Sequence, residues 1–397
     1  MRNSCGVRLF MPLDDCLRRR RIRLLYVGAL GLLFLCASTN AIFGQDSNTG
    51  KLSLRTGKEI FLAGCVGCHG PDGKGMPETT TGFEKPSTFP DFTACDQTTP
   101  EYDVDYKATI RDGGRGRGFS RIMPSFGGVL TPEQIDLVVG YLRSLCRDKT
   151  WPRGELNVPR AIATEKAYPE DEVVITSAVN AQGTASVENE FVYEHRIGKK
   201  TQLEISAPFS FDKQNNNSWF GGLGDIGLGV KRVLFSSLDT GSILSVQQGV
   251  NFPSGNHSRG FGTGVTVFET FASYGQLLPA NSFLQLQAGT DLPKSTVNTP
   301  RSIFGRAALG KSFRQSEGLG RMWSPMAEFL WDRSFETGAK TNFDVMPEFQ
   351  VTLSQRQHVR LALGVRIPAT NTAGRPVQAV FYLLWDWFDG RIQDGWK

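Results

Sequence analysis

The chain has 397 residues, an ordinary apolar content of 40% and a formal net charge of +5. Its excess of positive charge lies mainly in the arginines between residues 18 and 23, and without them the balance is near neutral. The charge therefore gives no support for nucleic-acid binding, while the length allows more than one domain.

The N-terminal residues have the pattern of a secretory signal. The basic residues at 18–23 precede an apolar stretch, Leu24–Cys36, and small residues follow between positions 37 and 41. The apolar stretch is too short to span a bilayer, whereas a basic, an apolar and a small-residue region in this order are typical of a signal peptide. We predict a signal peptide over residues 1–44 and export to the periplasm or outer membrane of a Gram-negative-type bacterium; an uncleaved anchor is the alternative.

The motif Cys65-Val66-Gly67-Cys68-His69 follows this region. C-x-x-C-H is the pattern for covalent attachment of a c-type haem, because two thiols at this spacing reach the two vinyl groups and the adjacent histidine can bind the iron. A zinc site would need a second ligand pair at similar spacing, and the sequence contains no second C-x-x-C. A thiol-exchange site would need a βαβ setting, which the neighbouring sequence lacks.

Helices are predicted on both sides of a long irregular stretch. Thr56–Cys65 and Glu101–Arg111 have helical character, whereas Gly70–Thr99 is rich in Gly, Pro and Thr. The clearest helix begins after Thr131, where Gln134 completes a capping box with Pro132 at the first helical position. Apolar residues then recur at helical spacing: Ile135, Val138, Val139, Leu142 and Leu145.

A methionine before this last helix is the candidate for the sixth iron ligand. Met123 lies in Met123-Pro124-Ser125-Phe126, and a thioether is a soft ligand that raises the potential of a haem iron. The alternative, Met76, lies so soon after His69 that the chain would have to cross at once to the other face of the ring. We therefore predict His69 and Met123 as the axial pair.

Residues 50–150 resemble class I cytochrome c in the order of helix, C-x-x-C-H, long loop, M-P-x-F and C-terminal helix. The resemblance implies an electron carrier with one covalent haem c. Cys65 and Cys68 would be its attachment sites, and His69 and Met123 its iron ligands. It also implies a redox partner protein, which the sequence does not identify.

Two features depart from this family pattern. The long loop contains Cys95, which can form a disulfide with Cys146 in an oxidising compartment; two separate buried thiols are the alternative. The run Gly113–Gly118 is rich in glycine and arginine. Either a solvated basic loop or pairing with haem propionates would explain the cations here, which are Arg111, Arg115 and Arg117.

The pattern changes after a proline-containing linker at 151–171. Segments of about ten residues in 172–397 alternate apolar and polar positions, as in membrane β-barrels. His358–Ile367 is the clearest example. About twelve strands are predicted, near 172–180, 186–196, 201–211, 225–235, 242–252, 264–274, 282–292, 302–313, 324–335, 341–353, 358–367 and 376–388.

An even strand count lets an antiparallel barrel close without an exposed edge. Short and long connections roughly alternate, which is typical of an outer-membrane barrel with both ends on the periplasmic side. The stretch Gly221–Lys231 resembles the G-L-G-D-x-x-L-G-x-K strand of outer-membrane barrels of the phenol meta-pathway and transporter-like type. A soluble β-sandwich, which also has alternating strands, is the alternative.

These patterns predict a multidomain protein: a small all-α cytochrome c domain followed by an antiparallel all-β transmembrane barrel in contact with outer-membrane lipid. Electron transfer is the first hypothesis, and an outer-membrane channel or transporter with an accessory or redox-sensing cytochrome is the second. A haem enzyme is the third, but one haem with both axial positions filled argues against it. No nucleic-acid partner is expected.

Overall fold

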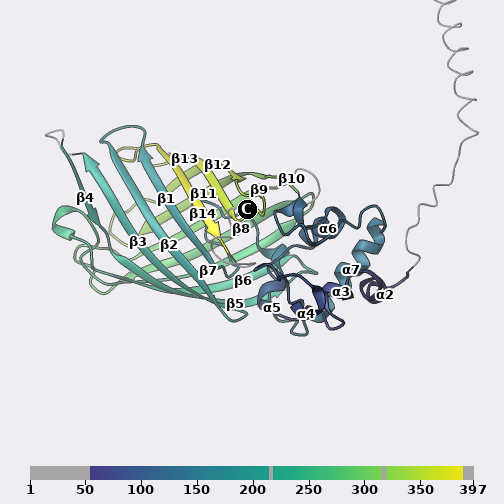
Figure 1. Cartoon of the computed structure of the whole chain (residues 1–397). Helices are drawn as coiled ribbons and strands as arrows, with labels where there is room; N and C mark the ends of the chain where they lie inside the picture. Colours follow the sequence, from purple (N-terminus) through teal and green to yellow (C-terminus); the bar gives the residue numbers. More distant parts are fainter. Residues whose placement is uncertain (1–53, 214–217, 315–318, 388–397) are drawn as a thin grey trace, which may run out of the picture. The chain divides into compact units, whose positions relative to one another are not determined.

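The computed structural model describes residues 54–213, 218–314 and 319–387, so the predicted signal peptide lies outside the described residues. A helical region comes first and a β-barrel follows, and both belong to one compact unit that begins at residue 51 (Figure 1). Among the helices that the structure describes, none is long and apolar enough to cross a lipid bilayer.

The predicted helices of the first region are present, with additional short ones. The helices are α2 (Gly57–Gly64), α3 (Val66–His69), α4 (Glu78–Thr81), α5 (Cys95–Thr98), α6 (Asp103–Asp112), η1 (Gly114–Arg117), α7 (Pro132–Leu145) and η2 (Gly154–Leu156). The predicted capping box of Thr131 and Gln134 begins α7, and Thr56 and Glu59 form a second one on α2. The stretch expected to be irregular contains α4 and α5 as single turns.

The core of this region forms where α2 crosses α7. A side chain at Gly57 would place its Cβ 1.9 Å from the carbonyl oxygen of Leu137, so only glycine allows this close approach. Ile60 and Phe61 of α2 are almost fully buried at the crossing. They pack with apolar residues of α7 at the predicted helical spacing, Ile135, Val138, Val139 and Leu142.

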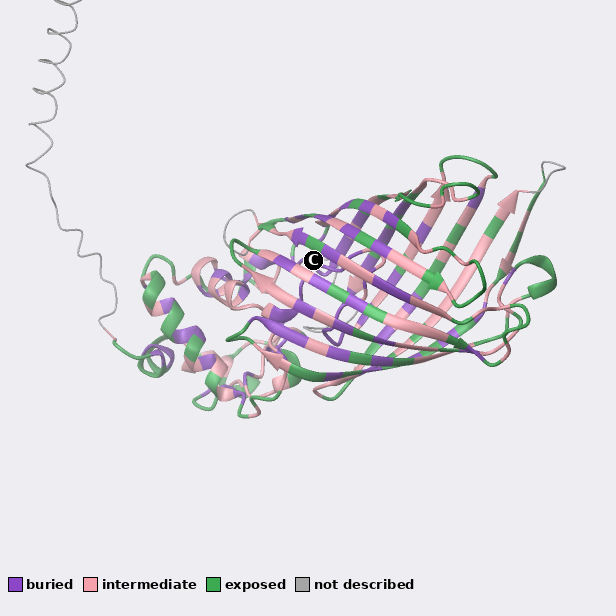
Figure 2. Cartoon of the chain, turned by 180° about the vertical axis from the view of Figure 1, so that it is seen from behind, coloured by how far each residue is buried: buried purple, intermediate pink, exposed green. Residues whose placement is uncertain are grey.

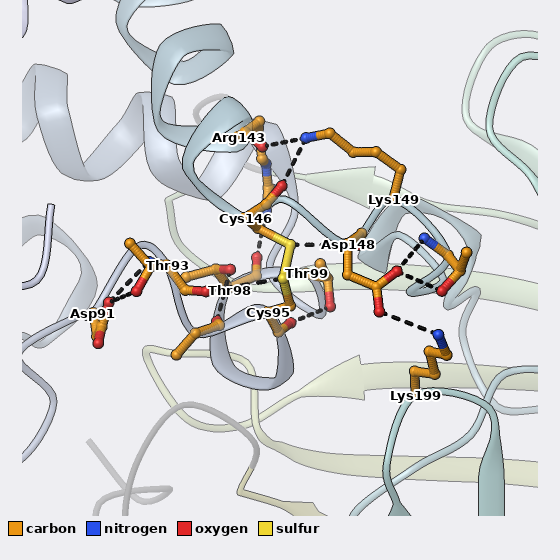
Figure 3. The surroundings of a disulfide bond; sticks show 12 residues. Asp91, Thr93, Cys95, Thr98, Thr99, Arg143, Cys146, Asp148, Lys149 and Lys199 are labelled. Carbon is orange, nitrogen blue, oxygen red and sulfur yellow. Dashed lines mark hydrogen bonds and ion pairs between the residues drawn. A yellow bond between two sulfur atoms is a disulfide. The ribbon is translucent and has the colours of Figure 1, made fainter. Parts of the chain in front are cut away.

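A disulfide joins Cys95 to Cys146, with a sulfur–sulfur distance of 2.02 Å (Figure 3). It links the start of α5 to the C-terminal cap of α7. The structure therefore decides between the two alternatives that the sequence left open. Since α5 belongs to the long loop, the bond fixes the end of this loop to the last helix.

The second region is a closed antiparallel barrel. Its strands are β1 (Glu172–Asn180), β2 (Ser186–Ile197), β3 (Thr201–Lys213), β4 (Trp219–Leu223), β5 (Ile226–Ser237), β6 (Ser242–Phe252), β7 (Val267–Leu278), β8 (Ser282–Pro293), β9 (Ser302–Lys311), β10 (Phe313–Arg314), β11 (Met322–Ser334), β12 (Asn342–Thr352), β13 (Val359–Pro368) and β14 (Gln378–Asp386). Pairing of β14 with β1 closes the ring. Since β4 and β5 follow each other along β3, and β9 and β10 along β11, the ring has twelve positions, as predicted.

The barrel strands turn apolar side chains outward and polar ones inward. On β5, Ile226, Leu228 and Val230 are exposed, whereas Gly227 and Lys231 are buried. Exposed and buried positions alternate along most of the strands (Figure 2). This is the reverse of a soluble fold, so the β-sandwich alternative is wrong.

Connections at the two ends of the barrel differ in length. The connections 198–200, 238–241 and 279–281 lie at the end where the chain enters β1 and leaves β14, and 253–266 and 369–377 lie at the opposite end. This arrangement follows the predicted alternation of short turns and long loops.

The segment expected to be a linker, 151–171, lies largely inside the barrel. Val158 and Ala161 pack against inward-facing Phe283, Ala308 and Met326. We call residues 156–170 the plug. The segment does connect the two regions, but its plug part is a buried element of the barrel interior.

Candidate haem site

The haem-attachment motif lies where α2 ends and α3 begins. Cys65 is both the C-terminal cap of α2 and the N-terminal cap of α3. The backbone N–H groups of Cys68 and His69 donate to the carbonyl oxygen of Cys65, at 3.2 and 3.0 Å. This single tight turn holds the three side chains of the motif in one short stretch, and the two cysteines form no disulfide with each other.

The environment of Cys65 disfavours thiolate chemistry. Burial, together with the neighbouring Cys68, raises the pKa of the Cys65 thiol to about 11. Zinc binding and thiol exchange both use the thiolate form, which this environment makes scarce at neutral pH. Thioether formation with a vinyl group remains compatible with a protonated thiol.

His69 is prepared to act as a neutral metal ligand. Its ring lies 5.1 Å from the ring of Phe89 and 5.1 Å from that of Phe92. Burial lowers the pKa of His69 to about 4, so the imidazole is neutral at pH 7. Among the residues that the structure describes, none forms a hydrogen bond with the buried Nδ1 atom, so the imidazole is not committed to a protein partner through this nitrogen.

Met123 is held in the loop between η1 and α7. The N–H of Gly114 donates to the carbonyl oxygen of Met123 at 3.1 Å. A Cβ on Gly113, whose φ is +78°, would lie 2.9 Å from the same oxygen, so the loop packs directly on the end of α6. The N–H of Phe126 then donates to the carbonyl oxygen of Ile110 at 2.9 Å, which fixes the other side of the methionine loop.

All four predicted site residues line one cavity of about 470 Å³. They are Cys65, Cys68, His69 and Met123, whereas the alternative ligand Met76 is not among the residues that line it. Much of the wall is apolar and comes from the core described above, including Phe61, Ile110, Phe126, Val138 and Leu142. Two thiols, an imidazole and a thioether around an apolar cavity form a donor set that fits a covalent haem.

Charged side chains form part of the cavity wall. Asp105 of α6 and Arg117 of η1 both line it, and their side chains are 6% and 2% exposed. Arg117 Nη1 donates to Asp105 Oδ1 at 2.9 Å, and Arg314 Nη1 of β10 donates to the same oxygen at 3.1 Å. Of the three arginines singled out from the sequence, Arg111 instead pairs with Asp112.

Sequence reasoning missed Asp105 and Arg314. Asp105 is one of several acidic residues on a short helix, and nothing in its spacing distinguishes it. Arg314 lies 209 residues away, so only the folded chain brings it to Asp105.

The part of the chain that the structure describes contains one other group of possible metal ligands. Glu165, Glu194 and Glu204 have carboxylate oxygens within 4.8 Å of one another inside the barrel. Lys231 lies 3.4 Å from Glu165, and Arg160 lies 2.9 Å from Glu194. Two of the three carboxylates therefore already pair with cations of the protein, and we do not propose a metal centre here.

Comparison with protein families identifies the first region. Residues 54–146 match the family model described as cytochrome c, so the chain contains a cytochrome c domain. Such a domain implies a covalently bound haem c. No curated protein matches the chain at a significant level.

Several solved structures resemble the barrel. An outer membrane channel from Pseudomonas putida F1 is 13% identical, and the match covers 58% of this chain and 100% of that one with a TM-score of 0.37. KdgM porin is 7% identical over 54% of this chain and 99% of its own, with a TM-score of 0.35. The β domain of the Bordetella autotransporter BrkA is 11% identical over 54% and 98%, with a TM-score of 0.34. These scores are too low to transfer a function, so the barrel fold rests on the strand pairing itself.

Proposed function

We propose that this protein transfers electrons through one haem c, attached to Cys65 and Cys68 and ligated by His69 and Met123. The observation that carries the proposal is the convergence of these four side chains on one largely apolar cavity. A haem held there would supply an iron that cycles between Fe(II) and Fe(III).

The surrounding residues favour electron transfer over catalysis. His69 is kept neutral by burial, and the loop Met123–Phe126 is fixed at its two ends by backbone hydrogen bonds to Gly114 and Ile110. A haem ligated by both of these side chains would leave no coordination site for a substrate. Apolar walls exclude water from the site, and the two ligands therefore need little rearrangement when the iron changes charge.

We further propose that the barrel anchors the cytochrome in the outer membrane, with the domain on the periplasmic side. The outward face supplies the required apolar surface. Its exposed large residues include Leu203, Ile205, Leu228, Leu286, Phe329, Leu363 and Phe381. Membrane barrels combine such a band with a polar interior and with short turns on the periplasmic side.

The plug supports an anchor rather than a channel. Side chains of the barrel wall bind its backbone: the N–H of Ile162 donates to Glu348 Oε2 at 3.0 Å, and the N–H of Glu170 donates to Gln202 Oε1 at 2.7 Å. Gln285 Nε2 donates to the carbonyl oxygen of Pro159 at 3.0 Å. The wall is thus complementary to the main chain of the plug.

Ion pairs hold the plug as well. Arg160 lies 2.8 Å from Glu172 and 2.9 Å from Glu194, two strand residues that are fully buried. Lys166 lies 3.4 Å from Glu172. Leaving any of these charges buried without its partner would cost several kcal/mol. Occupation of the lumen by these plug residues therefore supports an anchor over the channel hypothesis.

The ligation is tested by the absorption spectrum of the full-length protein carrying Met123→Ala, with Met76→Ala as the matched control. His/Met ligation gives a weak near-infrared sulfur-to-iron band in the oxidised protein. We expect the band in the wild type and in Met76→Ala and its loss in Met123→Ala. A band that survives Met123→Ala, or that is absent from the wild type, contradicts the proposed ligand set.

A further inference from the structure

The segment that connects the cytochrome domain to the barrel is held by contacts with both. The N–H of Gly154 donates to the carbonyl oxygen of Thr99 at 2.7 Å, and Arg153 Nη2 lies 2.8 Å from Asp103 Oδ1. Residues 153–155 are therefore bound to the cytochrome domain, and the plug begins at the next residue, Leu156. A connection that is bound on both sides leaves little freedom for the cytochrome to move away.

At this junction a barrel residue reaches the wall of the haem cavity. Arg314 belongs to β10, its side chain is 17% exposed, and its guanidinium donates to Asp105 at 3.1 Å. The same guanidinium lies 4.6 Å from the centre of the Tyr102 ring, which restricts its position further. Asp105 thus accepts hydrogen bonds from Arg117 of the cytochrome and from Arg314 of the barrel.

Arg314 adds a second guanidinium group beside Asp105. This part of the wall is nearly dry, since the side chains of Asp105 and Arg117 are only 6% and 2% exposed. In such an environment the interaction between a charged side chain and the iron of a haem in the cavity would be screened much less than in water. A nearby positive charge disfavours Fe(III), which carries one more positive charge than Fe(II).

We propose that Arg314 is a positioning residue of the haem site, through which the barrel raises the reduction potential of the cytochrome by acting on Asp105 and Arg117. This inference rests on the proposed function, because it assumes a haem in the cavity. It means that the barrel sets the electrochemical properties of the domain in addition to anchoring it.

The test is a redox titration of the full-length protein, followed by its visible spectrum, for Arg314→Gln and Arg314→Lys. At a fixed applied potential we expect Arg314→Gln to shift the Fe(II)/Fe(III) ratio at least about threefold toward Fe(III). This shift corresponds to about 28 mV at 59 mV per tenfold change. The charge-retaining Arg314→Lys should restore most of the wild-type ratio.

Two further variants separate electrostatics from loosened packing. Lys199→Gln removes one positive charge at the same junction, where Lys199 pairs with Asp148 at 3.2 Å (Figure 3), but neither residue lines the haem cavity. Its ratio should stay within about twofold of the wild type. Asp105→Asn removes the negative charge and should shift the ratio toward Fe(II), opposite to Arg314→Gln.

The inference is overturned if Arg314→Gln shifts the ratio no more than Lys199→Gln, or if Asp105→Asn shifts it in the same direction as Arg314→Gln. Loss of the near-infrared band in Arg314→Gln would also overturn it, because the residue would then act on ligation. Absence of that band from the wild type instead refutes the proposed His69/Met123 ligation. An intact wild-type band with an unshifted ratio refutes the role of Arg314 alone.

Discussion

Glu328 provides the sharpest test of how the plug is held inside the barrel. Its carboxylate accepts hydrogen bonds from the N–H groups of Ala163 and Thr164, at 2.9 and 2.7 Å, and from the Thr164 hydroxyl. Glu328→Ala would leave two backbone donors buried without their acceptor. At about 1–3 kcal/mol for each unsatisfied donor, release of the plug becomes easier by about 4 kcal/mol. This corresponds to a rise of about a thousandfold in the population in which the plug is released.

Reactivity of a buried thiol can measure this population. Val158 of the plug is 7% exposed, and Val158→Cys introduces a slightly smaller side chain there. If the plug fills the lumen, a water-soluble thiol reagent reacts with Cys at 158 only during transient release. We expect slow labelling in the otherwise wild-type protein, and labelling faster by about a thousandfold when Glu328→Ala is added.

Two controls define the meaning of this result. Glu328→Gln keeps an acceptor oxygen and should give a clearly smaller increase. Glu188→Gln removes a charge from an exposed β2 position and should leave the labelling rate unchanged. A rise of less than about tenfold for Glu328→Ala would refute the magnitude argued from the two donors. Labelling of Val158→Cys as fast as in the denatured protein would refute the filled lumen itself.

Two predictions concern the stability of the cytochrome domain. Replacing both disulfide cysteines with serine, Cys95→Ser and Cys146→Ser, should lower its free energy of unfolding by about 4 kcal/mol, since the bond closes a loop with a sequence separation of 51. Guanidinium unfolding measures this loss, and a change below about 1 kcal/mol would contradict it. Burial alone would raise the pKa of Asp103, but Arg143 and Arg153 outweigh it and lower the pKa. The stability due to Asp103 should therefore be present above about pH 4 and be lost as the pH falls through the lowered pKa. Asp103→Asn should then lower the free energy of unfolding at pH 7 and leave it unchanged in acid. An equal difference in free energy of unfolding between wild type and variant at both pH values would contradict this.

Much of this structure follows from local sequence patterns. The capping residue Thr131 and the apolar spacing after it define α7, because a helix start depends on neighbouring residues only. Twelve barrel positions follow from two-residue alternation, since each strand must expose one face to an apolar surrounding. The haem motif also needs only adjacent residues.

The plug could not be predicted in this way. Residues 151–171 show neither helical nor strand periodicity, because the backbone of the plug is bound by side chains of the barrel wall instead of by its own or a neighbouring backbone. From the sequence alone, a segment of this kind is predicted to be a linker. The contact of Arg314 could not be predicted either, because its partner Asp105 is remote in the chain.

The glycine-rich motif at the start of β5 contacts neighbouring strands, a long loop and the plug. A Cβ on Gly227 would lie 2.3 Å from Ser206 Oγ, and one on Gly229 would lie 2.9 Å from Gln247 Nε2, so a larger residue at either position would require these side chains to move. Lys231, next on that face, is 1% exposed and lies 3.4 Å from Glu165 of the plug. Asp225 serves the opposite end of the barrel, where its carboxylate accepts from the N–H groups of Gly255 and Thr263. Along one strand, this motif thus binds a long loop, leaves space inside the crowded wall and pairs with the plug. Those roles fit a barrel whose interior is occupied in part by its own chain, as expected for an anchor of the cytochrome domain.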